Sequence, residues 1–266
     1  MRSLNYSRPG SLADALCALR NDPQSKVLAG GQTLLPALKL RLSAPSTLID
    51  LQAIDELRGV VAGGGRITVA AMTSHAELAA DESVRKLAPA LSALAAGIGD
   101  RMVRNMGTIG GSIANNDPAA DYPAALLAMN AIVVTTSRRI AAEDFFRDLY
   151  GTALAADELV KAVEFPAARR AAYVKFRHPA SRFALVGVFV ADTGEGPRVT
   201  VTGAGSVAFR VHEYEQALGK GFREDAIAGV TANFGSLNSD MHASDEYRRN
   251  LIPEIARRAI LRALQY

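Results

Sequence analysis

Two short glycine-containing segments carry residue types that could bind a phosphate group. They are AGGQT at residues 29–33 and TIGGS at residues 108–112. Adjacent glycines let successive backbone N–H groups turn toward one point, because no Cβ blocks the approach and positive φ angles are open to them. Each segment ends in a hydroxyl residue that could add a hydrogen bond to a phosphate oxygen. Two such segments on opposite sides of a diphosphate would explain both.

The glycine pairs also have a purely structural explanation, because paired glycines often mark turns. Gly63–Gly65, which separate two alternating apolar segments, predict a hairpin of that kind. Neither AGGQT nor TIGGS matches the G-x-G-x-x-G spacing of a Rossmann turn or the G-K-[ST] ending of a P-loop. On spacing alone, a phosphate site and a pair of structural turns both stay open.

No group of side chains suited to catalysis is visible. The glycine-rich segment over residues 108–123 holds Asp117 and Asp121 but neither His nor Cys, so it lacks a nucleophile and a soft metal ligand. Cys17 is the only cysteine, which excludes a disulfide framework and an iron–sulfur cluster bound by this chain. We therefore assign no catalytic residue and no metal ligand.

The segments around AGGQT predict a small α/β unit over residues 1–55. Ser11, with Asp14 three positions later, is typical of a helix start, and KVLAGG and STLIDL are typical of buried strands. Residues 56–167 then predict a hairpin, the helices SHAELAA and SVRKLAPALSALAAGIG, a loop over residues 108–123, a helix in DYPAALLAMNA and two strands.

The pattern changes at about residue 168. Three strand-like segments are followed by three helix-like ones, predicted over residues 211–219, 224–235 and 245–266. Strands first and helices afterwards favour an α+β unit with helices packed on a sheet. We therefore predict one domain over residues 1–167, with lobes of about 1–55 and 56–167, and a second domain over residues 168–266.

Composition fits a globular protein of 266 residues, with 49% hydrophobic and 21% charged residues. The formal net charge is +3 and the basic residues are scattered, which does not favour nucleic-acid binding. The amino terminus lacks the apolar core of a signal peptide, and no apolar segment is long enough to span a membrane. We expect no membrane span and a cytoplasmic location.

Three longer segments resemble a known family from end to end. VLAGGQTLLPALKLRL, RNMGTIGGSIANNDPAADYPAALLA and DMHASDEYRRNLIPEIARRAI, in this order and separation, resemble the FAD-binding medium subunit of molybdenum-containing hydroxylases. That family includes carbon monoxide and xanthine dehydrogenases. The resemblance implies an α+β fold: a two-lobed FAD-binding domain of the vanillyl-alcohol-oxidase (PCMH) type, with the cofactor between the lobes, followed by a smaller C-terminal α+β domain of helices on a sheet.

The resemblance also implies which residues contact FAD. Backbone N–H groups of both glycine segments would surround the diphosphate, and Asp121 would accept hydrogen bonds from cofactor hydroxyls. Lys175 and, eight residues later, Phe183 would lie near the isoalloxazine, where many relatives have Tyr in place of Phe183. A core position is the alternative for Phe183, and Leu159 is a further residue that would line the flavin. The two segments contribute Ala29, Gly30, Gly31, Gln32, Thr33, Thr108, Ile109, Gly110, Gly111 and Ser112.

The function that the resemblance implies is electron transfer within an oxidoreductase complex. A large subunit would carry the molybdenum cofactor, a small subunit would carry [2Fe–2S] clusters, and the FAD of this chain would pass their electrons to an external acceptor. The resemblance implies a dimer of such heterotrimers. Two alternatives stay open: a stand-alone flavin oxidoreductase of the same fold, and a non-redox scaffold that has lost FAD.

Overall fold

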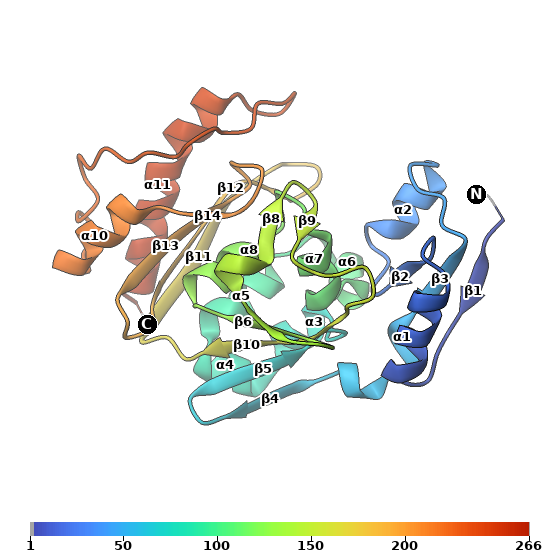
Figure 1. The fold of residues 1–266 in the computed structure, drawn as a ribbon. Coiled ribbons are helices and arrows are strands. Elements are labelled where there is room, and N and C mark those ends of the chain that lie inside the picture. Colours follow the sequence, from blue (N-terminus) through green and yellow to red (C-terminus); the bar gives the residue numbers. More distant parts are fainter. Residues whose placement is uncertain (1–2, 266) are drawn as a thin grey trace.

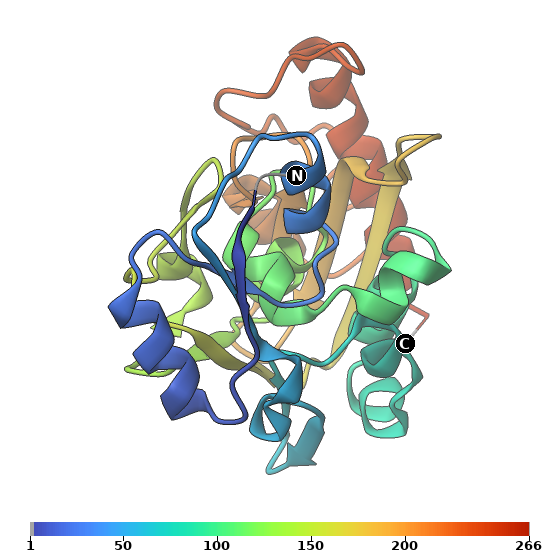
Figure 2. The ribbon, with the colours of Figure 1, turned by 90° about the vertical axis from the view of Figure 1, so that its right-hand side faces the viewer.

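The computed structural model describes residues 3–265, and its amino-terminal lobe is a small parallel sheet flanked by two helices (Figures 1 and 2). The strand order is β1-β3-β2. The predicted helix start is confirmed, because the Ser11 side chain accepts a hydrogen bond from the amide of Asp14 at 3.1 Å. The elements are β1 (Asn5–Ser7), α1 (Leu12–Asn21), β2 (Lys26–Leu28), α2 (Leu34–Lys39) and β3 (Thr47–Asp50).

A five-stranded antiparallel sheet of order β4-β5-β10-β6-β7 follows. Its first two strands form the predicted hairpin, and the turn residues Gly64 and Gly65 both have positive φ angles. Two short 3-10 helices lead into it. The elements are η1 (Leu51–Ala53), η2 (Asp55–Leu57), β4 (Val60–Gly63), β5 (Arg66–Ala70), β6 (Ile132–Thr135), β7 (Arg139–Ala141) and β10 (Val160–Pro166).

Short helices pack around this sheet, and two segments differ from expectation. The apolar segment over residues 83–99 is divided between two helices at Pro89, because proline supplies no N–H group to continue the first helix. The expected loop over residues 108–123 contains a helix, α7. The elements are α3 (His75–Ala80), α4 (Glu82–Leu87), α5 (Pro89–Ala96), α6 (Arg101–Met106), α7 (Ile109–Asn115), α8 (Tyr122–Ala128), α9 (Ala142–Phe145), β8 (Phe146–Asp148) and β9 (Gly151–Thr152).

The C-terminal part is an antiparallel sheet covered on both faces. Helices α10 and α11 pack on one face and α8 packs on the other (Figure 1). Along the second strand, Val186, Val188 and Val190 join the apolar cluster with α10 and α11, whereas Phe189 and Ala191 join the cluster with α8. The elements, in sheet order and then helices, are β11 (Arg170–Arg177), β12 (Ala184–Asp192), β13 (Pro197–Thr202), β14 (Phe209–Arg210), α10 (His212–Lys220) and α11 (Asp245–Ala263).

One predicted helix is wrong. Residues 224–235 form turns and irregular chain, and they attach to the C-terminal core through Ile227 and Phe234. Gly229 and Gly235 have φ angles of +73° and +62°, which are incompatible with a right-handed helix. The last predicted helix begins at Asp245 as expected and ends at Ala263; Tyr266 lies outside the described residues. The predicted domain boundary at 167/168 falls between β10 and β11 and stays a prediction.

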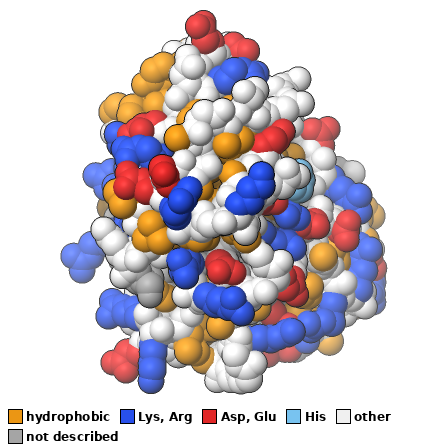
Figure 3. Space-filling view, turned by 90° about the vertical axis from the view of Figure 1, so that its left-hand side faces the viewer, with side chains coloured by type: hydrophobic (Ala, Val, Ile, Leu, Met, Phe, Trp, Pro, Cys, Tyr) orange, Lys and Arg blue, Asp and Glu red, His pale blue; other side chains and the backbone are white. Residues whose placement is uncertain are grey.

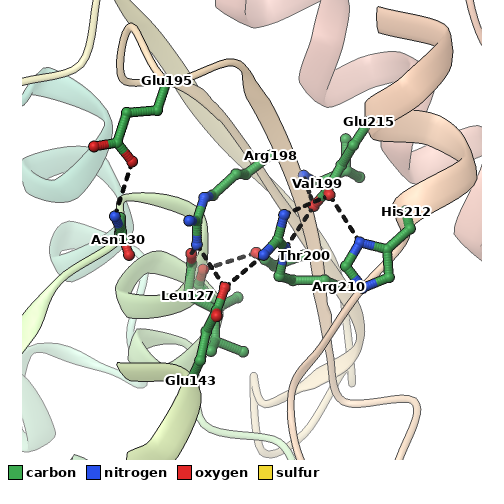
Figure 4. Close-up of polar contacts among 11 residues, drawn as sticks. Leu127, Asn130, Glu143, Glu195, Arg198, Val199, Thr200, Arg210, His212 and Glu215 are labelled. Carbon is green, nitrogen blue, oxygen red and sulfur yellow. Dashed lines mark hydrogen bonds and ion pairs between the residues drawn. The ribbon is translucent and has the colours of Figure 1, made fainter. Parts of the chain in front are cut away.

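Ion pairs connect the two parts of the chain at α9 (Figure 4). The Glu143 carboxylate of α9 accepts hydrogen bonds from Arg198 of β13, at 2.7 Å, and from Arg210 of β14. Arg210 also pairs with Glu215 of α10 at 2.7 Å. The two Glu143 contacts join the C-terminal sheet to α9, whereas the Arg210–Glu215 pair lies within the C-terminal part.

The surface carries charges of both signs. On the face shown in Figure 3, Lys and Arg side chains are interspersed with Asp and Glu. Within residues 3–265, none of the helices is long and apolar enough to cross a membrane.

Candidate functional site

The two glycine segments lie against each other. A Cβ on Gly30 would be 2.0 Å from the carbonyl oxygen of Met106 and 2.7 Å from the Cα of Gly107. A Cβ on Gly111 would be 3.2 Å from the Cβ of Ala29. Residue 30 therefore has to be glycine if the backbone at 106–107 is to keep its place, and this close approach brings residues 29–33 beside α7.

The first segment carries unpaired backbone donors. The N–H groups of residues 30–34 have no hydrogen-bond acceptor among the described residues, and they lead into the first turn of α2. Successive N–H groups at a helix amino terminus attract anions, because their partial positive charges are not neutralised by intrahelical carbonyls. The Gln32 side chain donates to the Gly30 carbonyl at 3.2 Å. This segment fits a diphosphate.

The second segment differs from the sequence-based expectation. Its N–H groups are engaged within the chain: Ile109 donates to the Thr73 carbonyl at 3.2 Å, and Gly110 donates to the Ala71 carbonyl at 2.8 Å. The N–H groups of the next two residues donate to the side chain and carbonyl of Thr108, which caps α7. The expectation of free N–H groups is therefore wrong for residues 109–112 in this structure. These groups hold α7 against residues 71–73.

A small cavity of about 130 Å³ lies beside both segments. Arg58 is its one basic lining residue, and its guanidinium donates to the Gln52 carbonyl at 2.9 Å. Leu159 is buried in the apolar cluster of the amino-terminal lobe, which also contains the cavity residue Met72. The cavity is lined by Ala29, Gly30, Gln52, Arg58, Met72, Ser74, Glu77, Asn105, Met106 and Thr108.

Asp121 and Lys175 form a buried ion pair. The Lys175 Nζ lies 2.9 Å from both carboxylate oxygens of Asp121, and the two side chains are 3% and 4% exposed. Tyr173 adds a hydrogen bond from its hydroxyl to Oδ1 of Asp121. Burial raises the pKa of Asp121 above its ordinary value, and the Lys175 ammonium and the Tyr173 hydroxyl oppose that rise. The structure thus brings together Asp121, which the family resemblance implies as an acceptor for cofactor hydroxyls, and Lys175, which it implies near the isoalloxazine.

Phe183 lies at the end of a tight loop between β11 and β12. The His178 amide donates to the Phe183 carbonyl at 2.8 Å, and the Phe183 side chain is 48% exposed. The alternative of a core position for Phe183 is therefore wrong. An exposed aromatic ring held by a closed loop can present its face to a planar group, so a contact with the isoalloxazine stays a prediction.

Sequence reasoning missed two groups that contact residues of this candidate site. His75 donates its backbone N–H to the Gly107 carbonyl at 2.9 Å, and its ring Nδ1 lies 3.0 Å from the Tyr122 hydroxyl. Burial, together with the nearby charge of Arg104, lowers the pKa of His75 to about 4, so its ring is neutral at pH 7. The other group is Tyr173, for which the signal was its position two residues before Lys175 on the same face of a strand.

Comparisons with known proteins show which protein family the chain resembles. Residues 2–168 match the family model described as "FAD binding domain in molybdopterin dehydrogenase". The medium subunit of nicotine 6-hydroxylase from Paenarthrobacter nicotinovorans is 35% identical, over 98% of this chain and 97% of that subunit. The carbon monoxide dehydrogenase medium chain of Hydrogenophaga pseudoflava is 31% identical, over 96% of this chain and 95% of that one.

Solved structures of related proteins have the same fold over nearly the whole length of this chain. A chain of Hydrogenophaga pseudoflava carbon monoxide dehydrogenase superposes with a TM-score of 0.90 and 32% identity, over 99% of this chain and 98% of that one. A chain of quinoline 2-oxidoreductase from Pseudomonas putida 86 gives a TM-score of 0.90 and 30% identity, with the same coverage. The fold is thus a PCMH-type FAD-binding domain followed by a sheet domain packed with helices. The chain belongs to the family of FAD-binding medium subunits of molybdenum-containing hydroxylases, and it is the flavoprotein subunit of such an oxidoreductase.

Proposed function

We propose that this chain binds FAD and transfers electrons within a heterotrimeric molybdenum hydroxylase. It would take them from [2Fe–2S] clusters of a small subunit and pass them to an external acceptor, while a large subunit carries the molybdenum cofactor. The names of its relatives support a place in a complex, because nicotine 6-hydroxylase and carbon monoxide dehydrogenase each have a medium subunit or chain. We further propose a dimer of heterotrimers.

The observation that carries the proposal is the run of open N–H groups at residues 30–34, held beside α7 by the close contact of Gly30 with Met106. These donors suit a diphosphate. The Asp121 carboxylate would repel a phosphate but suits the hydroxyl groups of a ribityl chain, because an ionised carboxylate only accepts hydrogen bonds. The protein thus has N–H donors that suit the diphosphate and a carboxylate acceptor that suits the hydroxyl groups, which match two chemically different parts of FAD.

The residues of this chain bind and orient the cofactor and move no proton. Bound FAD supplies the ability to accept electrons singly and to release them in pairs. Lys175 would place a positive charge beside the flavin, and Phe183 would cover one side of its ring. Leu159 would contribute apolar surface on the side of the amino-terminal lobe. Within residues 3–265, three or more His, Cys, Asp or Glu side chains nowhere gather in a way that could hold a metal ion, so the metal centres are proposed for the partner subunits.

The test begins with the purified chain and added FAD. We expect stoichiometric binding, so that the protein keeps the visible absorption bands of a flavoprotein after free FAD is removed. A protein without flavin bands, even after FAD is added, would favour the scaffold alternative. The second step is affinity purification of the tagged chain from its native host, followed by metal analysis. Co-purifying subunits with molybdenum and iron would support the relay function. A flavin-loaded chain that oxidises organic substrates without partners would favour the stand-alone enzyme.

A further inference from the structure

The hydrogen bonds of Asp121 are unequally divided between its two oxygens. Oδ1 accepts from the Tyr173 hydroxyl and from Lys175, whereas Oδ2 accepts only from Lys175 among the described residues. Each carboxylate oxygen can accept about two hydrogen bonds. Oδ2 therefore has capacity for one more donor, and Oδ1 is saturated.

The position of Tyr173 depends on a glycine in the neighbouring strand. Gly187 of β12 lies directly opposite Lys175 in the sheet register. A Cβ on Gly187 would be 2.3 Å from the Tyr173 hydroxyl oxygen and 3.0 Å from its Cζ. The ring of Tyr173 also stacks on Phe189, with ring centroids 6.1 Å apart. The tyrosine ring thus lies over a strand position without a side chain, and its hydroxyl is directed at Asp121.

We propose that Tyr173 is a positioning residue of the cofactor site. Seated over Gly187, it holds Oδ1 of Asp121, so that Oδ2 and Lys175 remain in place for the cofactor. This inference rests on the proposed function, because it takes FAD as the ligand. A hydrogen bond from a hydroxyl to a buried carboxylate is charge-assisted, so it can fix the orientation of Asp121 better than a neutral contact could.

The direct test is Tyr173→Phe, which keeps the ring and removes only the hydroxyl. The matched control is Tyr214→Phe, because Tyr214 is a buried tyrosine of the C-terminal part that packs in the other apolar cluster. We expect FAD affinity to fall about tenfold or more in Y173F and to be unchanged in Y214F. Equal affinity of Y173F and wild type would overturn the inference alone. Failure of the wild type to bind FAD would overturn the proposed function as well.

A purely structural role is distinguished by the pH dependence of FAD binding. Asp121 faces Lys175, Tyr173 and Arg177 of β11 and lies next to Tyr122 of α8. The Tyr173 hydroxyl lowers the pKa of Asp121, so its loss in Y173F should raise that pKa. On acidification, Asp121 of Y173F should therefore be protonated, and FAD affinity should begin to fall, at a higher pH than in wild type. If FAD bound more weakly to Y173F at every pH, but the pH dependence of binding were the same as in wild type, the inference would be contradicted.

The contact with Gly187 gives an independent test through a double variant. Gly187→Ala should displace the Tyr173 hydroxyl and weaken FAD binding by a similar factor. Because both changes remove the same hydrogen bond, the double variant should lose no more affinity than the weaker-binding single variant. Losses that multiply would show that Gly187 and Tyr173 act separately, and would contradict the inference.

Discussion

Gly30 lies so close to Met106 that a Cβ on the glycine would come within 2.0 Å of the Met106 carbonyl oxygen. Through this contact the end of β2 meets the chain between α6 and α7, although the two segments are far apart in sequence. The open N–H groups that follow Gly30 are thereby held beside α7. The geometry of the proposed diphosphate site thus depends on this backbone contact, together with the close approach of Gly111 to Ala29.

Replacement of Gly30 by alanine should separate the two segments. The new methyl group would meet backbone atoms, which cannot rotate away as a side chain can, so we expect a loss of about 1–3 kcal/mol in the free energy of unfolding. FAD should also be lost on desalting, measured as the ratio of flavin to protein absorbance. Gly219→Ala is the control, because a Cβ at that position of α10 meets open space. Full flavin content in G30A would refute this assignment.

Replacement of Lys175 by methionine should destabilise the chain by about 3–5 kcal/mol, because it leaves the buried Asp121 carboxylate without its cation. The combined variant Asp121→Asn with Lys175→Met should be less destabilised than K175M, since it removes both charges. Urea unfolding of the FAD-free proteins measures both values. Equal stabilities of wild type and K175M would show that the ion pair is unimportant for the fold.

Replacement of Phe183 by alanine should separate binding from folding. The side chain is 48% exposed, so its loss should change the free energy of unfolding by about 0.5 kcal/mol or less, while FAD binding weakens. Phe189→Ala is the contrasting variant, because Phe189 is fully buried and its truncation should cost about 3–5 kcal/mol. Unchanged FAD affinity in F183A would remove Phe183 from the proposed site.

The features that could be predicted from the sequence are those that depend on residues close together along the chain. The start of α1 at Ser11 and the hairpin at Gly64 and Gly65 follow from capping and turn preferences, and both are present. The helix expected over residues 224–235 is absent, because apolar spacing gave a helical pattern while Gly229 and Gly235 adopt positive φ angles. Local patterns do not reveal which conformation a glycine takes.

Contacts between distant segments account for what the sequence could not show at the site. The N–H group of Gly110 donates a hydrogen bond to the Ala71 carbonyl, and a Cβ on Gly110 would come within 2.7 Å of that same oxygen. Bulkier residues at position 110 would therefore test folding more than FAD binding. The hydrogen bond from Tyr173 to Asp121 joins residues 52 positions apart, so only the fold reveals it.

The buried ring of His75 should make stability depend on pH. In the folded chain its pKa is about 4, against an ordinary value of 6.5, because burial disfavours the charged ring. Between pH 6.5 and 4 the His75 ring therefore binds a proton in the unfolded chain but not in the folded chain. The free energy of unfolding is thus unaffected by His75 above pH 6.5 and decreases as the pH falls toward 4. The difference amounts to about 3 kcal/mol. Urea unfolding between pH 4 and 7.5 measures it.

The variant His75→Gln isolates this effect from that of the carboxylates. Glutamine does not titrate, so the stability of H75Q should vary less with pH than that of wild type between pH 4 and 6.5. If H75Q and wild type lost stability in parallel on acidification, the His75 ring would already accept a proton in the folded chain, and burial would not lower its pKa.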